Sequence, residues 1–285
     1  MKYFDLHADT VYRCLGENLD FNDKALHITA DKASAFDEWY QCFAVFIEDG
    51  IAEPFKYYKK AVSFLKKEFE SKPKNLTPIL AVEGGLLIEN DLSRIETMHN
   101  DGIRALTLTW NAENQIAGGT YSDVGLKDFG KDVIKELNRF EIMVDLAHIN
   151  KNSYYQALEL ADKPVITHTC LECFNEHRRN IDDHQIKALV QKNGIMGLCF
   201  YPLFLGKGDV FENIYKNVYH ILDLGYEDYL CIGSDFDGCK LSDRLADISY
   251  IPSLYEYLKS RNIDKETLDK IFFYNAYNFF KNKGE

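Results

Sequence analysis

The sequence lacks the features that mark nucleic-acid-binding, membrane or exported proteins. Its apolar runs are broken by charged residues long before they reach membrane-spanning length, so we expect no membrane partner. Basic residues are outnumbered, with 33 Lys and Arg against 45 Asp and Glu, which disfavours nucleic acids and anionic lipid surfaces. No charged-then-apolar leader opens the chain, and we therefore expect a cytoplasmic protein.

Proline and cysteine are also scarce. There are 6 prolines, no Pro/Gly-rich linker and no internal repeat, which predicts a single domain over residues 1–285. The 7 cysteines are odd in number and irregularly spaced, and so fit reduced thiols better than a disulfide framework. A hydrophobic content of 46% is enough for one large core or two modest domains.

What the chain does have is a repeated alternation of short apolar segments with amphipathic ones. The predicted strands are residues 3–9, 41–47, 78–84, 103–110, 142–148, 164–169, 194–200 and 230–237. The predicted helices are residues 55–71, 91–100, 128–140, 151–161, 182–192 and 211–224, followed by C-terminal helices at 251–261 and 265–282. Eight strand–helix units in about 250 residues predict an α/β fold, the (β/α)8 TIM barrel. A doubly wound open sheet is the alternative, but the first strand-to-helix turn carries no glycine-rich phosphate loop.

Polar side chains follow the apolar run in several of these strands. The residues concerned are His7, Asp9, Glu83, His148, His168 and Asp235. In a barrel, the carboxyl ends of the strands meet at one face, where the chemistry takes place. A single residue of this kind is more often a capping or hydrogen-bonded group, but their recurrence at five strand ends favours a metal site.

The residue types indicate the kind of metal. Imidazoles and carboxylates suit zinc or a similar divalent ion, and manganese or cobalt would also be accepted. Three imidazoles and two carboxylates, without Asp235, exceed the three protein ligands usual for one catalytic zinc. We therefore expect two divalent metal ions that share Glu83 as a bridging ligand.

These residues belong to a longer series of motifs that resembles one family. The chain resembles the membrane dipeptidase (renal dipeptidase) family of metallopeptidases, within the amidohydrolase-like barrels. The matching motifs are His7-x-Asp9, Val82-Glu83-Gly84-Gly85, Leu106-Thr107-Leu108-Thr109, Val133-Ile134-Lys135-Glu136-Leu137-Asn138-Arg139, Asp145-Leu146-Ala147-His148, Thr167-His168-Thr169, Arg178-Arg179-Asn180 and Gly233-Ser234-Asp235-Phe236-Asp237-Gly238.

The resemblance implies a set of roles. One zinc ion would be held by His7, Asp9 and Glu83, and the other by Glu83, His148 and His168. The activity implied is hydrolysis of dipeptides, including those with a C-terminal D-residue, by a hydroxide that bridges the metals. Asp235 would be the catalytic proton shuttle and Arg179 would bind the substrate carboxylate, although Arg178 beside it leaves the register open by one. Asp237 is expected to be a structural turn acid, and a homodimer is a further expectation from the family.

One position departs from the family. Mammalian members carry a substrate-contacting histidine after Leu-Thr-Leu-Thr, where this chain has Trp110. Indole donates one hydrogen bond but accepts no proton, so either the metal alone stabilises the oxyanion or Asn111 or Asn114 substitutes. We place Trp110 and Asn111 among the substrate-binding residues. Two other functions stay open: an amidohydrolase acting on N-acyl amino acids, and a catalytically silent barrel that serves as a binding module.

Overall fold

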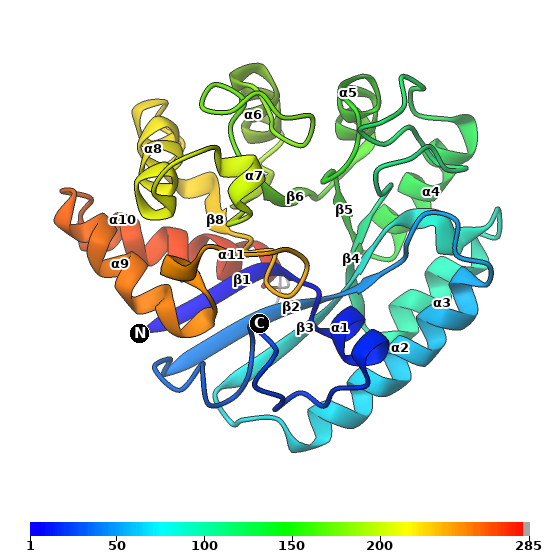
Figure 1. The fold of residues 1–285 in the computed structure, drawn as a ribbon. Helices are drawn as coiled ribbons and strands as arrows, with labels where there is room; N and C mark the ends of the chain where they lie inside the picture. The colour runs from blue at the N-terminus through cyan, green and yellow to red at the C-terminus, as the bar shows by residue number, and fades with distance from the viewer. Residues whose placement is uncertain (282–285) are drawn as a thin grey trace.

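The strands form a closed barrel in the computed structural model, which describes residues 1–281 (Figure 1). The strands are β1 Lys2–Ala8, β2 Glu38–Phe46, β3 Leu76–Glu83, β4 Ile103–Thr107, β5 Met143–Asp145, β6 Pro164–Thr169, β7 Ile195–Leu198 and β8 Leu230–Ile232. Each strand pairs in parallel with the next, and β1 pairs with β8 through Asp5 and Ile232. The predicted (β/α)8 barrel is therefore confirmed, and closure excludes the open doubly wound sheet.

The helices surround the barrel, largely where the sequence predicts them (Figure 1). Their bounds are α1 Thr10–Glu17, α2 Pro54–Glu68, α3 Ser93–Asp101, α4 Asp128–Arg139, α5 Lys151–Leu160, α6 Asp183–Gln191, α7 Pro202–Leu205, α8 Val210–Asp223, α9 Ile251–Ser260, α10 Lys265–Asp269 and α11 Asn275–Phe280. The sequence prediction omitted α1 and α7. The start of α6 is a capping box, in which Asp182 accepts from the Gln185 amide and the Gln185 side chain accepts from the Asp182 amide.

The C-terminal segment differs from the single continuous helix expected over residues 265–282. A π-helical turn, Lys270–Tyr274, separates α10 from α11, and position 282 lies outside the described residues. The turn buries three successive side chains: Ile271 and Phe272 pack into the outer core, and Phe273 packs into the barrel core. A regular α-helix spreads successive residues around its axis, so the wider turn lets this segment face two cores.

The barrel interior has its own apolar core. Every strand contributes to one cluster of buried side chains, and the C-terminal segment adds Phe273, Ala276 and Phe280. Phe4 on β1 packs against the rings of Tyr40, Phe273 and Phe280 near the amino ends of the strands. Aromatic packing therefore fills the barrel interior near this end, and a surface pocket of about 460 Å³ lies beside these rings.

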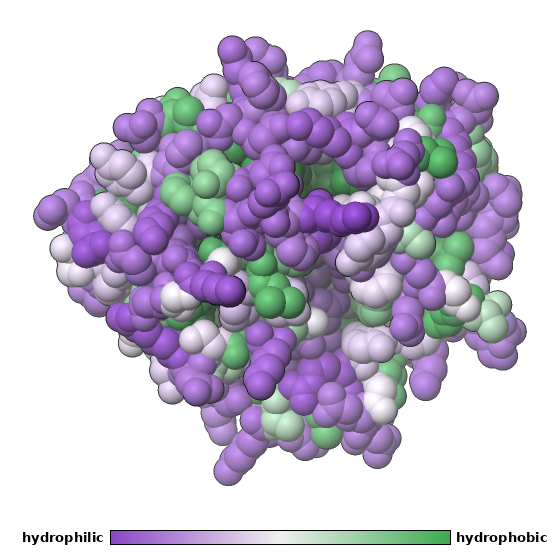
Figure 2. Space-filling view, turned by 45° about the horizontal axis from the view of Figure 1, so that its top comes forward, coloured by the Kyte–Doolittle hydropathy of each residue, from purple (hydrophilic) through white to green (hydrophobic). Residues whose placement is uncertain are grey.

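The face of the molecule that Figure 2 shows is mainly hydrophilic. On this face, hydrophobic residues occur in small separate patches among hydrophilic ones (Figure 2). No helix within residues 1–281 has both the length and the apolar character needed to cross a bilayer.

Candidate metal centre

The predicted ligands meet at the carboxyl end of the barrel, in a cavity of about 310 Å³. Asp9, Glu83, His148, His168 and Asp235 all line it. The local backbone aims them there: β1 is irregular between Asp5 and Ala8, and β6 between Ile166 and Thr169. Irregularities of this kind redirect side chains next to active sites.

The first ligand group comes from β1 and β3. His7 Nε2 lies 3.2 Å from Asp9 Oδ2 and 3.5 Å from Glu83 Oε2, and all three side chains are buried. The other carboxylate oxygen of Asp9, Oδ1, is buried without a hydrogen-bond partner among the described residues. A buried carboxylate oxygen without a partner is costly unless a cation neutralises it.

The second group lies on the other side of Glu83. His148 Nε2 is 2.7 Å from Glu83 Oε1, and His168 Nε2 is 3.6 Å from the same oxygen. Glu83 therefore directs one oxygen toward each group. His148 has a positive φ of 63°, an uncommon backbone state that holds its ring toward the cavity.

The hydrogen bonds behind the two imidazoles allow a test of whether the site fits a metal. His148 Nδ1 faces Asn111 Oδ1 at 2.9 Å, and His168 Nδ1 faces Thr167 Oγ1 at 3.0 Å. The Thr167 hydroxyl donates to Asp145, so its oxygen accepts from His168. With both Nδ1 atoms donating, both Nε2 atoms carry lone pairs, yet they lie 2.9 Å apart. Two facing lone pairs need a cation between or beside them, so this donor set fits a bound metal.

The pKa values of the metal-free protein agree with that arrangement. Burial, with a contribution from Arg179, lowers the pKa of His148 to about 4. Burial and His7 lower the pKa of His168 well below its ordinary value, so both rings are neutral near pH 7, as metal ligands must be. Burial would raise the pKa of Glu83, but the neighbouring His7 lowers it well below its ordinary value.

His7 and Asp9 behave differently. Burial would lower the pKa of His7, yet the Asp9 and Glu83 carboxylates raise it well above its ordinary value. Burial, with repulsion from Glu83, raises the pKa of Asp9. Protons therefore stabilise this group in the absence of a metal, and a bound cation would displace them.

Asp235 stands beside both groups. It follows β8 with a positive φ of 64°, and its amide donates to His7 O at 3.2 Å. Its carboxylate falls within ligand distance of His7 and His168. Burial raises its pKa to about 6, with His7 opposing and Glu83 adding to the shift. A side chain at position 238 would collide with Asp9 and Asp235, since a Cβ there would lie 2.1 Å and 2.5 Å from their oxygens, so Gly238 is required.

Asp237 has the structural role expected of it. Its carboxylate accepts from Thr10 Oγ1 at 2.7 Å and from the His27 amide at 2.6 Å, and it pairs with Arg13. These contacts join α1 and the following loop to the end of β8. Because both oxygens of Asp237 are used in them, its carboxylate does not face the cavity.

The structure also distinguishes the two adjacent arginines. Arg179 is 6% exposed and lines the cavity, whereas Arg178 is exposed and stacks over Tyr121. The Arg179 guanidinium donates to His168 O at 3.1 Å through Nη2, and its Nε is buried without a hydrogen-bond partner among the described residues. It is the one Lys or Arg among the described residues that line the cavity, so it can receive an anionic group there.

The residues after β4 divide into two sets. Trp110 is half-buried and lines the cavity between Phe46 and His148, with ring-centroid distances of 5.0 Å and 6.1 Å. Asn111 lines the cavity but also orients His148. Asn114 donates to Leu108 O and accepts from the amides of Ile116 and Ala117, so its side chain is used within its own loop.

Sequence reasoning assigned no role to Asp145 or Thr167. Asp145 accepts from the hydroxyls of Thr107 and Thr167 at 2.5 Å and 2.7 Å, and Thr167 in turn fixes the His168 ring. Such partners fix the tautomer and orientation of a metal-binding histidine. The available signal was a charged residue inside β5 and a hydroxyl directly before His168, but neither reveals its partner.

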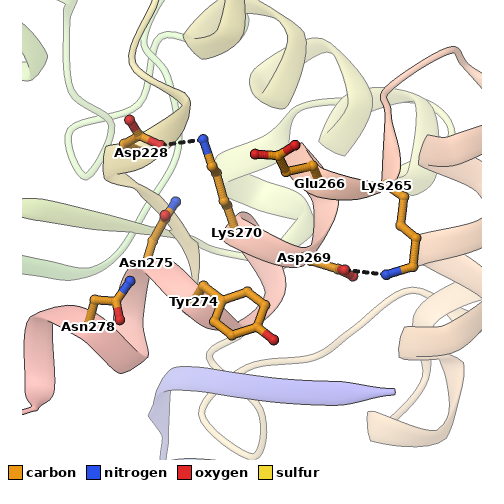
Figure 3. Close-up of a pocket in the computed structure, with 8 residues that line it drawn as sticks. All are labelled: Asp228, Lys265, Glu266, Asp269, Lys270, Tyr274, Asn275 and Asn278. Carbon is orange, nitrogen blue, oxygen red and sulfur yellow. Dashed lines mark hydrogen bonds and ion pairs between the residues drawn. The ribbon is translucent and has the colours of Figure 1, made fainter.

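Two other polar sites have different character. A surface cavity of about 610 Å³ lies beside α10 and the π-helical turn, where Lys265 pairs with Asp269 and Lys270 with Asp228 (Figure 3). On the outer surface, Cys173, Asp183 and His220 come together, and His220 Nε2 is 2.8 Å from Asp183 Oδ1. Most of their charged groups are paired, and Glu266, which forms no ion pair within the described residues, is exposed, unlike the buried groups at the barrel mouth.

A closed (β/α)8 barrel with this cluster at its carboxyl end defines the class of amidohydrolase-like barrels. The sequence profile of the membrane dipeptidase family, peptidase family M19, matches residues 55–283. The chain belongs to this family of metallopeptidases.

Individual relatives agree with that assignment. The chain is 30% identical over 207 residues to dipeptidase tcpJ of Claviceps purpurea, a match that covers 70% of this chain and 49% of that protein. It is 26% identical over 224 residues to an uncharacterized protein in the pqqA 5′ region of Klebsiella pneumoniae, covering 73% of this chain and 83% of that one. The chain thus spans about half the length of the Claviceps relative.

Solved structures show the same fold. The crystal structure of dipeptidase AC, a metallo peptidase, superposes with a TM-score of 0.90 at 22% identity, over 98% of both chains. A metallo peptidase from Rhodobacter sphaeroides, liganded with a phosphinate mimic of the dipeptide L-Ala-D-Ala, superposes with a TM-score of 0.83 at 20% identity, over 98% of both chains.

Proposed function

We propose that this protein is a dipeptidase that uses two divalent metal ions, zinc by preference, with Glu83 as the shared ligand. The observation that carries the proposal is the approach of His148 Nε2 and His168 Nε2 to 2.9 Å with both lone pairs facing one another. His7, Asp9 and Glu83 would hold one ion, and Glu83, His148 and His168 the other. The unpartnered Asp9 Oδ1 supports the first of these groups.

Bound divalent ions would polarise the scissile carbonyl and make a water molecule acidic enough to attack near neutral pH. Asp235 would accept the proton of that water and pass it to the departing amine. A pKa raised toward neutrality by burial suits a group that must both take and release a proton. Its position beside His7 and His168 places it where such a transfer would occur.

Arg179 would fix the substrate by its terminal carboxylate. Its guanidinium faces the cavity as a buried cation, and a planar guanidinium can donate to both oxygens of a carboxylate. A cavity of about 310 Å³ suits a small substrate better than a longer peptide. A C-terminal residue of either hand would be accepted, because the carboxylate and the carbonyl are the groups held.

The test is hydrolysis of L-Ala–L-Ala, L-Ala–D-Ala and N-acetyl-L-Ala by full-length protein after chelation and after reloading with zinc, manganese or cobalt. We expect both dipeptides to be cleaved only by metal-loaded protein, and faster than the N-acetyl amino acid. Faster cleavage of N-acetyl-L-Ala would favour the amidohydrolase alternative. Metal binding without cleavage of any of the three compounds would identify a silent barrel.

A further inference from the structure

The cavity has two sides that differ in how their aromatic residues are used. Tyr12 follows β1, Phe46 ends β2 and Trp110 follows β4, and we call these three residues the aromatic wall. Arg179 lies across the barrel on the loop after β6, next to Phe204 from α7. Because the strands close in sequence order, β2 stands opposite β6, and the aromatic wall therefore faces Arg179 across the metal centre.

The rings on the Arg179 side already have partners. The Arg179 guanidinium lies over the Phe204 ring at 5.3 Å, and His177 and Tyr201 lie against the same ring at 4.7 Å and 5.0 Å. Phe204 is 7% exposed. The rings on this side are therefore packed, and its open features are the cation and Leu203 on α7, which is 60% exposed at the cavity.

The aromatic wall is different, because the side chain that it leaves uncovered is an aromatic ring. Tyr12 packs edge-on against Phe46 at 5.1 Å, and Phe46 packs edge-on against Trp110 at 5.0 Å. Tyr12 nevertheless remains 40% exposed at the mouth of the cavity. A large apolar surface left open beside a polar cavity typically binds a ligand.

We infer that the aromatic wall selects dipeptides whose N-terminal residue has a large apolar side chain, aromatic ones above all. This inference rests on the proposed function. With the terminal carboxylate on Arg179 and the scissile carbonyl over the metal centre, the C-terminal residue lies on the Arg179 side. The N-terminal residue then extends toward Trp110 and Tyr12, where its side chain covers the exposed ring. Aromatic rings supply such contact at a low cost in conformational entropy, and prefer edge-on or offset partners.

The experiment compares two dipeptides of identical composition, L-Phe–L-Ala and L-Ala–L-Phe, together with L-Ala–L-Ala. We expect metal-loaded wild-type protein to show a higher kcat/KM for L-Phe–L-Ala than for L-Ala–L-Ala. In Tyr12→Ala, the ratio of kcat/KM for L-Phe–L-Ala to that for L-Ala–L-Phe should fall by about two- to tenfold, the size of one lost aromatic contact. The change should lie mainly in KM, since the contact is made in ground state and transition state alike.

Two further variants sharpen the result. Leu203→Ala alters the opposite rim and should not lower the ratio of kcat/KM for L-Phe–L-Ala to that for L-Ala–L-Phe. Trp110→Phe, which replaces one ring of the aromatic wall by a smaller one, should lower it. Tyr219 on α8 is 54% exposed and does not line the cavity, so Tyr219→Ala should leave all rates unchanged. If Tyr12→Ala changes kcat/KM equally for both isomers, or for neither, the inference about the aromatic wall is wrong while the proposed dipeptidase function still stands. If metal-loaded protein cleaves none of the dipeptides, both the proposed function and the inference about the aromatic wall are wrong.

Discussion

The two ends of this barrel are built on opposite principles. At the amino end, Phe4, Phe273 and Phe280 close the interior with apolar rings that have no unmet interactions. At the carboxyl end, three imidazoles and three carboxylates are buried in three overlapping groups, each with its ligand atoms within 4.8 Å of one another, and some of their lone pairs have no protein partner. The first arrangement stabilises the fold, and the second is costly unless a ligand completes it.

The larger surface cavity in Figure 3 adds a second contrast. At about 610 Å³ it is roomier than the cavity at the barrel mouth, yet its lysines are paired with neighbouring acids near the surface. Exposed pairs of this kind contribute little energy, and the remaining acid, Glu266, is exposed, so water can solvate it. Buried groups without partners therefore indicate the functional site better than cavity size does.

The largest effect is expected from removing the shared charge at the carboxyl end. Glu83→Gln keeps the shape of the side chain but weakens both metal groups at once. We expect kcat to fall by more than the ~10²–10⁴-fold typical of losing one proton-transfer residue. Metal content after dialysis should fall as well. Retention of two ions per chain in this variant would show that Glu83 does not bridge them.

Asp235→Asn should separate proton transfer from metal binding. We expect kcat to fall by ~10²–10⁴-fold with the metal content unchanged. Because burial raises the pKa of Asp235 to about 6, its proton-accepting form is present above that pH and lost below it. Bound cations lower this pKa. In the wild-type protein, kcat should therefore decrease as the pH is lowered, with a midpoint at or below about pH 6. An unchanged kcat in Asp235→Asn, or the same decrease of kcat at low pH, would show that Asp235 does not transfer the proton.

Phe273→Ala tests the amino end. Phe273 is 1% exposed and packs against Tyr40 and Tyr277, so truncation should lower the free energy of unfolding by about 3–5 kcal/mol. The next residue, Tyr274, is 40% exposed, and Tyr274→Ala should change stability by only about 0.5 kcal/mol. Denaturant unfolding measures both. Because the two ends are distinct, kcat per folded Phe273→Ala molecule should match wild type, and a large drop would contradict the separation.

The smallest effect should come from a residue beside the metal centre that positions a candidate ligand. Asn111→Ala removes the acceptor 2.9 Å from His148 Nδ1. Losing such a partner typically lowers metal affinity or activity by ~10–100-fold. Competition with a chelator would measure the affinity, and Asn114→Ala, which alters the same loop away from the cavity, is the matched control. An unchanged affinity would mean that Asn111 does not orient His148.

The barrel and the clustering of the candidate ligands at its carboxyl end were predictable from the sequence for a local reason. An apolar run that ends on His or a carboxylate can be recognised residue by residue, and barrel topology then brings those ends together. Helices α1 and α7 were missed because eight and four residues are too short for a clear helical period. The π-helical turn was missed because it coincides with burial against two separate cores, which the sequence pattern does not show.

Other parts of the site depend on contacts between segments far apart in the chain. The hydrogen bond from His148 to Asn111 spans 37 residues, and that from Thr167 to Asp145 spans 22. The sequence placed Asn111 in the cavity but could not show that it orients His148. The choice of Arg179 over Arg178 likewise required the fold, since adjacent residues of one type differ only in where the backbone directs them.

The most direct test of the central claim is the number of metal ions bound per chain in purified, zinc-reconstituted protein after dialysis. Elemental analysis by mass spectrometry, compared with protein concentration, gives this ratio. We predict a value close to two for wild type and close to zero for the His7→Ala/His148→Ala double variant, which loses one ligand from each group. A wild-type value near zero, or a double variant that still holds two ions, would contradict the assignment of this cluster as a two-metal centre.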